Sequence, residues 1–454
     1  MKNYLNDNIK NIFENLNELN CEGIIDILNK SNENYEKILK NNKKEFNYDN
    51  FVEDVDQLIE ENLNIIEDNQ FEEEILQFLS DWIIYHFLYK ILLEYKKNYA
   101  EAFENLKKAF YAFQEFYMNF NKPELSKIFK NYIKLLNNLT LLFNDNNMYY
   151  KYISDYGAIL MSFFSKFQNF NDETENTKYA VFFSIVCLIK TYFILKNYRN
   201  SLPLVKWCET QKIISNNNDN KNISSSDLCN YFYYNGRLSL YELNIITAHE
   251  KLTKAFEICI CSKNSKKNFF NNASVLYEYL IPLNLFLGFI PNYEYIKKYK
   301  LNKNYLTLID SFRNGNIILF EKSLDNLEDR IIQLGTFLIL GKLKPYVYRN
   351  LIKILYNIKY DDIKNDKNIE IRNSLGKKPF ILEIEIILEV INKLYVNNES
   401  NKFTIDDLVL EILGVLSKKI IAGYIHHVNK VIVFGKNPFP NLKENLINNY
   451  DKII

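Results

Sequence analysis

Residues 405–440 read IDDLVLEILGVLSKKIIAGYIHHVNKVIVFGKNPFP, and this stretch decides the fold of the C-terminal part of the chain. Apolar residues at three- and four-residue spacing predict an amphipathic helix over residues 405–419, which Thr404 can cap. Two short runs of alternating polarity then follow, Gly423–His426 and Val431–Phe434. Because only four residues separate these runs, they predict a β-hairpin.

Two further helices are predicted just upstream of this stretch. The first covers residues 346–358, with Pro345 tolerated in its first turn, and the second covers residues 381–394. The tract 361–379 between them is polar and is predicted to be a surface insertion. Three helices followed by a β-hairpin is the element order of a winged helix.

A short phrase occurs twice in the chain. Residues 102–110 read AFENLKKAF and residues 248–256 read AHEKLTKAF, so six of the nine positions agree. The small residues around the second copy are Gly236, Ala248 and Ala255. Their spacing is that of a tetratricopeptide-type helical hairpin, where only small side chains fit at the crossing. The first copy has Lys90 in place of the glycine. Both copies are predicted to be second helices of packed hairpins.

Much of the remaining chain also has the apolar spacing of helices. The clearest predicted helices cover residues 71–93, 99–120, 125–143, 179–195, 305–313 and 317–327. Gly315 separates the last two and can adopt the positive φ that a tight turn needs. The polar segment 216–226 is predicted to be a loop or a joint between domains.

Composition supports a long and mainly helical chain. A length of 454 residues suits two or three domains, and 11 glycines and 8 prolines are too few for a turn-dense β fold. The predicted fold is mainly α, a right-handed, TPR-like helical-repeat solenoid that ends in a C-terminal winged helix. Its expected parts are an N-terminal helical-repeat region (1–215), a TPR-like helical part (216–340), the winged helix (341–440) and a short tail (441–454).

Charge and cysteine content limit the functions that the chain can have. Lysine plus arginine equals aspartate plus glutamate at 56 each, so any nucleic-acid binding must come from a local patch. The six cysteines include no CxxC pair, so reduced and mostly buried thiols are expected, with no metal site and no cofactor. The most apolar run, 179–195, is interrupted by Lys190, and the N-terminus lacks the apolar core of a signal peptide. A soluble, intracellular protein without membrane insertion is expected.

No residue pattern in the sequence predicts an enzyme. Residues 335–343 superficially resemble a phosphate-binding loop, but the glycines are one residue too far apart. Leu343 also stands where a hydroxyl side chain must hold magnesium. His426 and His427 are consecutive, so their side chains point to opposite faces of a strand and cannot chelate one metal. No catalytic residue is therefore assigned.

Three stretches of the sequence carry a resemblance to a known family. They are YEYLIPLNLFLGFIPN (277–292), FLILGKLKPYVYRNLIKILY (337–356) and the opening stretch 405–440 with its closing NPFP. They resemble PCI-domain proteins, most of all the branch that includes the Thp-type subunit of the second transcription-export (TREX) complex. The resemblance covers roughly residues 228–360 and 400–440 and is weak before them.

This resemblance implies a non-enzymatic subunit of a nuclear-pore-associated complex that couples transcription to mRNA export. It implies two protein partners, a large Sac-type (GANP-like) PCI scaffold and a small acidic disordered subunit shared with the proteasome lid. The winged helices of the two PCI proteins would then form a joint platform for RNA or DNA. The expected location is the nucleus, at the nuclear pore, with the cytoplasm as a second location.

Basic residues near the winged helix are the candidates for nucleic-acid contact. They are Lys342, Lys344, Arg349, Lys353, Lys418, Lys419, Lys430 and Lys436. Arg349 and Lys353 are one helical turn apart and are expected to share a face, and Lys430 falls in the wing turn. Each can meet a phosphate, but none has a position that demands base reading. The acidic start of the last helix, at Asp406 and Asp407, disfavours insertion into a DNA groove.

Aromatic residues of the helical repeats are the candidates for partner contact. Four tyrosines are expected to line a groove that reads a partner segment, with core packing as the role of at least half of them: Tyr231, Tyr233, Tyr234 and Tyr241.

Two alternative functions remain open on the sequence. The first is a subunit of a proteasome-lid or COP9-signalosome-like PCI assembly, which the short stretch after NPFP disfavours because those subunits usually continue into a long helix. The second is an autonomous nucleic-acid-binding regulator, which the zero net charge disfavours.

Overall fold

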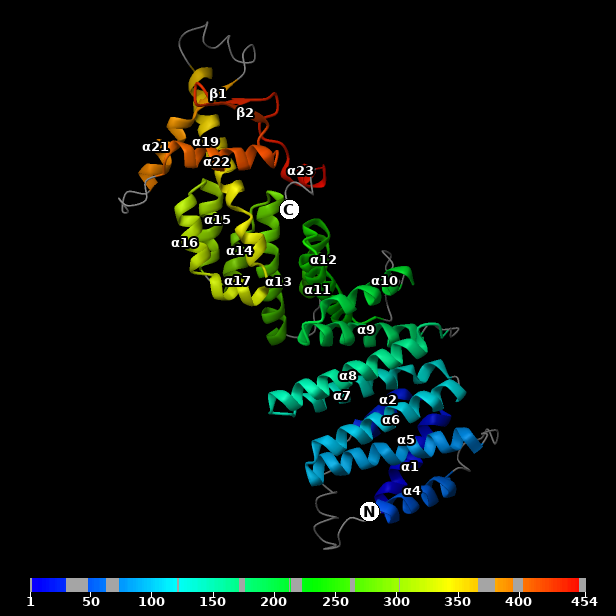
Figure 1. Cartoon of the computed structure of the whole chain (residues 1–454). Helices are drawn as coiled ribbons and strands as arrows, with labels where there is room; N and C mark the ends of the chain where they lie inside the picture. Colours follow the sequence, from blue (N-terminus) through cyan, green and yellow to red (C-terminus); the bar gives the residue numbers. More distant parts are fainter. Residues whose placement is uncertain are drawn as a thin grey trace. The chain divides into compact units, whose positions relative to one another are not determined.

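The computed structural model describes residues 2–29, 48–62, 73–120, 122–170, 176–211, 213, 223–261, 266–301, 303–365, 380–394 and 403–448. The chain divides into two compact units, Met1–Asp227 and Leu228–Ile454. Each unit is described by itself (Figure 1).

The first unit is a stack of helices. Its α-helices are α1 (Lys2–Asn17), α2 (Cys21–Asn29), α4 (Tyr48–Asn62), α5 (Glu73–Ile91), α6 (Tyr99–Phe120), α7 (Ser126–Thr140), α8 (Asn146–Phe167), α9 (Asn176–Ile194) and α10 (Leu202–Thr210). Successive long helices from α5 to α9 pack against one another and lie side by side in Figure 1. The helix predicted at 99–120 is confirmed at both ends. The ends of the other three helices predicted here differ by one to three residues, and residues 71–72 lie outside the described residues.

A buried hydrogen-bond relay organises the core of this stack. The Trp82 indole donates to the Tyr132 hydroxyl (2.5 Å), which donates to His86 Nδ1 (3.0 Å). His86 Nε2 donates in turn to the Leu28 carbonyl (3.1 Å). Burial, and then the charge of Lys90, hold the pKa of His86 well below its usual value, so the ring is neutral. The relay therefore ties α2, α5 and α7 together without burying a charge.

The first copy of the repeated phrase lies where the sequence predicts. It belongs to α6, which packs on α5, and both Ala102 and Ala109 are fully buried. Lys90 is also buried, but its ammonium group leaves the α5–α6 crossing and donates to the Ile27 carbonyl of α2 (3.0 Å). Helix α2 therefore supplies the hydrogen-bond acceptor for the lysine that stands at the glycine position.

Helix α9 is the most apolar helix of the first unit. By length and composition alone it would be long enough to cross a membrane, but 61% of its apolar window is buried inside the protein. It packs against α7 and α8. The structure therefore uses α9 as a core helix.

The second unit combines helical hairpins with a small sheet. Its elements are α11 (Ser225–Tyr241, which begins in the first unit), α12 (Ile245–Cys261), α13 (Lys266–Leu287), α14 (Tyr293–Lys298), α15 (Asn304–Asn314), α16 (Ile317–Asp325), α17 (Glu328–Leu334), α18 (Phe337–Gly341), α19 (Lys344–Lys364), β1 (Ile381–Glu383), α21 (Ile384–Leu394), α22 (Ile405–Ser417), β2 (Gly423–His426), β3 (Val431–Phe434) and α23 (Leu442–Asn448).

The predicted hairpin around the second copy of the phrase is confirmed. A Cβ added to Gly236 of α11 would lie 2.6 Å from Leu252 Cγ of α12. Ala248 and Ala255 are fully buried. The two helices therefore cross at a distance that only small side chains permit.

The turn between α15 and α16 joins the helical repeats to the winged helix. Gly315 has φ +68° and ends α15, and Asn316 caps α16 by accepting from the Leu319 amide (3.0 Å). A Cβ on Gly315 would lie 2.6 Å from both the amide nitrogen and the Cα of Leu351 in α19. Beside it, Asn350 donates to the Phe312 carbonyl (2.8 Å). The repeats therefore contact the backbone of α19 directly.

The predicted surface insertion and the expected tail are both partly helical. Helix α19 extends to Lys364, so the start of the predicted insertion 361–379 continues the helix, while 366–379 lies outside the described residues. The expected tail begins with α23, whose Leu446 is buried, and Leu442 packs over Gly288 at the end of α13. The predicted joint 216–226 falls mostly outside the described residues.

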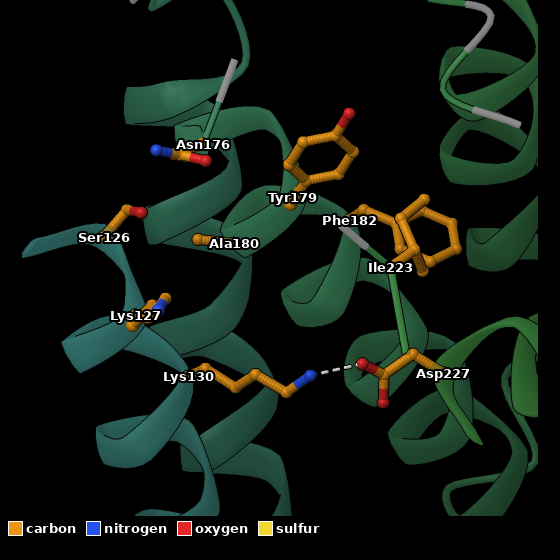
Figure 2. Close-up of a pocket in the computed structure, with 9 residues that line it drawn as sticks. All are labelled: Ser126, Lys127, Lys130, Asn176, Tyr179, Ala180, Phe182, Ile223 and Asp227. Carbon is orange, nitrogen blue, oxygen red and sulfur yellow. Dashed lines mark hydrogen bonds and ion pairs between the residues drawn. The ribbon is translucent and has the colours of Figure 1, made fainter. Parts of the chain in front are cut away.

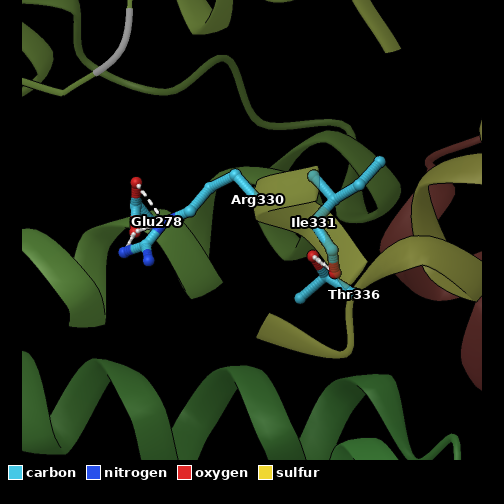
Figure 3. A network of polar contacts seen from close by, with 4 residues as sticks. All are labelled: Glu278, Arg330, Ile331 and Thr336. Carbon is cyan, nitrogen blue, oxygen red and sulfur yellow. Dashed lines mark hydrogen bonds and ion pairs between the residues drawn. The ribbon is translucent and has the colours of Figure 1, made fainter. Parts of the chain in front are cut away.

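A nearly buried carboxylate is held by an arginine between α13 and α17 (Figure 3). Glu278 has only 6% of its side chain exposed, and Arg330 grips both of its oxygens, with Nε at 3.0 and 3.2 Å. Just after the end of α17, the Thr336 hydroxyl donates to the Ile331 carbonyl (3.5 Å). The paired charges fix α17 against α13.

Arg330→Ala is expected to destabilise the protein by about 2 kcal/mol, because Glu278 stays buried without its cation while Arg330 itself is partly exposed. Urea unfolding measures this change. Adding Glu278→Gln to Arg330→Ala should recover part of the loss, since a neutral amide costs less to bury. A loss below about 0.5 kcal/mol for Arg330→Ala would show that the pair does not hold α17.

Candidate partner and nucleic-acid surfaces of the winged helix

The winged helix is built on a three-stranded antiparallel sheet in the order β1-β3-β2. The hairpin predicted at Gly423–His426 and Val431–Phe434 is confirmed, with Tyr424 opposite Val433. The helix predicted at 381–394 is wrong in its first three residues. They form β1, in which Leu382 pairs with Ile432 and is buried while its two neighbours are exposed. This extra strand covers the second edge of β3.

Helix α22 occupies the place of a recognition helix and is capped as predicted. The Thr404 hydroxyl accepts from the Asp407 amide (3.2 Å), and the Asp407 carboxylate accepts from the Thr404 amide (3.1 Å). The Thr404 hydroxyl also donates to the Asp407 carboxylate (2.6 Å), and this hydrogen bond, followed by the one from the Thr404 amide, lowers the pKa of Asp407. Leu408, Ile412 and Val415 fill the core beneath the helix. The acidic start of α22 therefore has a structural reason.

The NPFP segment is fixed against the winged helix by Arg349. The guanidinium donates to the Ile420 carbonyl (3.0 Å) and to the Pro440 carbonyl (3.2 Å), and lies 5.8 Å from the centre of the Phe439 ring. Phe439 also contacts Tyr356 of α19. Pro438 accepts a hydrogen bond from the Ala422 amide (2.9 Å). The NPFP segment therefore packs against the winged helix and is held there by Arg349.

Arg349 and Lys353 lie one turn apart on α19, as expected, but only Lys353 is exposed. Arg349 is only 7% exposed, and its burial lowers the pKa of the guanidinium. Its donors are used on backbone carbonyls, whereas Lys353 on the next turn is exposed. Arg349 therefore has a structural role, and we remove it from the candidate phosphate contacts.

The remaining basic candidates differ in exposure and partners. Lys353, Lys419, Lys430 and Lys436 are exposed, and Lys342, Lys344 and Lys418 are half-buried. Lys344 bridges Glu321 of α16 (3.1 Å) and Glu411 of α22 (3.2 Å), so its charge is already neutralised.

Lys418 and Lys419 directly follow α22, and together with two nearby lysines we call them the basic cluster: Lys342, Lys418, Lys419 and Lys436. Burial, and then the nearby charge of Lys342, lower the pKa of Lys418. Lys419 follows directly, and the Gly435 amide next to Lys436 donates to the Ala422 carbonyl (2.9 Å). Lys430 lies at the opposite end of the hairpin, in the wing turn. An anion at the cluster would relieve the repulsion between its cations.

The solvent-facing side of α22 carries no cation. Its exposed positions at helical spacing are Asp406, Leu410, Leu413 and Ser417, and the two leucines are 68% and 47% exposed. Neighbouring apolar side chains of this size suit a protein contact better than a phosphate backbone. These positions follow one another at spacings of three and four residues, but the stripe was not predicted from the sequence.

The four candidate tyrosines do not form one exposed groove. Tyr231 is only 1% exposed and belongs to the core, whereas Tyr241 is 55% exposed. Tyr233 and Tyr234 are half-buried. The Arg237 guanidinium lies over the Tyr233 ring (5.3 Å) and near Tyr279 (5.7 Å). Core packing thus accounts for Tyr231, and a partner can reach Tyr233, Tyr234 and Tyr241.

The first unit has a separate pocket of about 250 Å³ between α7, α9 and the start of α11 (Figure 2). Lys130 and Asp227 point toward each other across it and form an ion pair, and the Lys130 ammonium also lies 4.5 Å from the centre of the Phe183 ring. The lining also includes Ser126, and it contains neither histidine nor cysteine. We assign no reaction to this pocket.

Helical repeats that continue into a winged helix define a PCI-type scaffold. Several curated relatives match the chain. Enhanced ethylene response protein 5 from Arabidopsis thaliana is 29% identical over 56% of the chain, and PCI domain-containing protein 2 from Xenopus laevis is 28% identical over 59%. Protein CSN12 homolog from Debaryomyces hansenii is 27% identical over 60%. The matches span 55%, 59% and 61% of these relatives' own lengths.

The resemblance to PCI-domain proteins is confirmed, because the relatives that match the chain include PCI domain-containing protein 2. No family model matches the chain. PCI-domain proteins are generally non-catalytic scaffold subunits. The predicted fold class, a helical solenoid with a winged helix, is confirmed.

Proposed function

We propose that this chain is a non-enzymatic scaffold subunit of a transcription-export complex at the nuclear pore, where it pairs with a second PCI protein and binds nucleic acid jointly with it. The observation that carries this proposal is that the winged helix has two chemically different surfaces. The α22 face offers Leu410 and Leu413 for protein contact, while the basic cluster lies at the end of the same helix.

The proposed partners are those that the resemblance to PCI-domain proteins implies. A Sac-type (GANP-like) PCI scaffold would dock on the winged helix, and a small acidic disordered subunit shared with the proteasome lid would bind elsewhere on the helical repeats. The nucleus is the proposed location, with the cytoplasm as a second one. No cofactor enters this function.

Nucleic-acid binding is expected to depend on the basic cluster of the assembled pair. The double variant Lys419→Glu/Lys436→Glu should weaken binding of a labelled single-stranded RNA or duplex DNA about tenfold at physiological salt, because both exposed lysines can neutralise phosphates. Fluorescence anisotropy on the co-purified pair measures the dissociation constant.

The matched control is Lys196→Glu/Lys206→Glu, which makes the same charge change on exposed lysines of the first unit. It should leave the affinity within about twofold if the contact is local. If both double variants weakened nucleic-acid binding equally, the effect would come from the net charge of the protein and not from the basic cluster. Absence of binding by the unaltered pair would remove nucleic acid from the proposed function.

A further inference from the structure

Two cysteines face each other in the α11–α12 hairpin. The crossing pairs Gly236 of α11 with Leu252 of α12. Because the helices are antiparallel, moving seven residues back along α11 and seven forward along α12 reaches Cys229 and Cys259. Seven residues are close to two full helical turns, so both cysteines remain on the facing sides.

The contacts of the two thiols agree with this register. The Cys229 sulfur lies 3.4 Å from the carbonyl oxygen of Ala255, one turn before Cys259. The Cys229 thiol also lies within hydrogen-bonding reach of the Cys259 sulfur. Small side chains at the crossing bring the helix axes together, and disulfides need Cα atoms about 4.4–6.8 Å apart. The two thiols therefore contact each other across the hairpin, which is the contact that a closing dithiol needs.

The two thiols differ in pKa and in exposure. The hydrogen bond from Cys229 lowers the pKa of Cys259, whereas this hydrogen bond and burial raise the pKa of Cys229. Cys259 is 7% exposed, and Cys229 is half-buried near the exposed Asn230. Cys261, at the end of α12, is exposed. A small oxidant can therefore approach the pair from the Cys229 side.

We propose that Cys229 and Cys259 form a reversible disulfide that staples α11 to α12 under oxidation by a peroxide. The peroxide O–O bond breaks as one sulfur becomes a sulfenic acid, and the peroxide leaves as water or alcohol. The second thiol attacks that sulfur, the S–O bond breaks, and a second water leaves as the S–S bond forms. Two thiols lose two electrons and two protons, and the peroxide gains them. A thiol reductant reverses the step by exchange.

The disulfide would lie within the hairpin whose helix α11 carries Tyr233, Arg237 and Tyr241. Closing the bond limits opening of α11 away from α12, and therefore fixes the surface that α11 presents. The link joins residues about thirty positions apart, so it constrains the unfolded chain considerably.

The test uses the full-length reduced chain, exposed to hydrogen peroxide at low excess and then alkylated. Peptide mapping without reduction should find a Cys229–Cys259 link within one chain, and dithiothreitol should reverse it. The oxidised chain should unfold at a temperature higher by about 5 °C. Cys229→Ser and Cys259→Ser should each abolish the link and the shift.

Two control variants test whether the link is specific to Cys229 and Cys259. Cys208→Ser removes a buried thiol of the first unit and Cys261→Ser removes the exposed neighbour, and both variants should keep the link. A dominant Cys229–Cys261 link, a link between chains, irreversible oxidation of either cysteine without a link, or a lower unfolding temperature of the linked form would each overturn the proposal.

Discussion

Gly315→Ala is expected to destabilise the protein by at least about 4 kcal/mol, because the new methyl group meets backbone atoms that cannot move aside. Its Cβ would lie 2.6 Å from the Leu351 amide nitrogen and Cα, in the middle of α19. The positive φ of +68° adds strain for any residue other than glycine. The only relief is to move the α15–α16 turn away from α19, which separates the helical repeats from the winged helix.

The chain contains two matched controls for this variant. Gly335 also has a positive φ, +74°, but a Cβ there would meet nothing within 4 Å, so Gly335→Ala measures backbone strain alone and should cost about 1 kcal/mol. Gly414 has open space and no positive φ, so Gly414→Ala should be neutral or stabilising. Urea unfolding of the three variants measures the series. Equal losses for Gly315→Ala and Gly335→Ala would show that contact with α19 does not matter.

Arg349→Leu is expected to cost about 3 kcal/mol and to release the NPFP segment, since the carbonyls of buried Ile420 and half-buried Pro440 each lose a charged donor. The loss should appear in thermal unfolding and as faster protease cleavage near residues 435–440. Arg349→Lys should recover little, because an ammonium cannot reach both carbonyls with the geometry of a guanidinium.

Lys353→Leu is the control for this second prediction, since Lys353 is exposed one turn further along α19. Its effect on stability should stay within about 0.5 kcal/mol. If Arg349→Leu instead kept full stability and only weakened nucleic-acid binding, the structural role of Arg349 would be refuted and the role inferred from the sequence restored.

Elements with strong local signals could be predicted from the sequence. The hairpin strands and the Thr404 cap were found at their observed residues, because alternation and capping are properties of short segments. The small residues at Gly236 and Ala248 identified a helix crossing for the same reason. Strand β1 was missed because its three residues run directly into a helix of similar composition, and only pairing with β3 makes them a strand.

The candidate site was less predictable than the fold. A four-residue spacing placed Arg349 and Lys353 on one face of a helix, but it could not show that NPFP, some ninety residues later, covers Arg349. The facing of Cys229 and Cys259 likewise depends on the register between two helices. Lys344 was a candidate for phosphate, and its two carboxylate partners come from α16 and α22. Each of these facts is a tertiary contact without a local signal.

Affinity purification of the tagged full-length chain from its source cell, with identification and quantification of the co-purifying chains, tests the central claim most directly. The proposed scaffold role predicts a second PCI-domain protein in equal amount, together with a small acidic subunit, and predicts that Leu410→Glu/Leu413→Glu on the exposed face of α22 lowers recovery of that second protein. Recovery dominated by proteasome-lid or signalosome subunits, or of the chain alone, would contradict it.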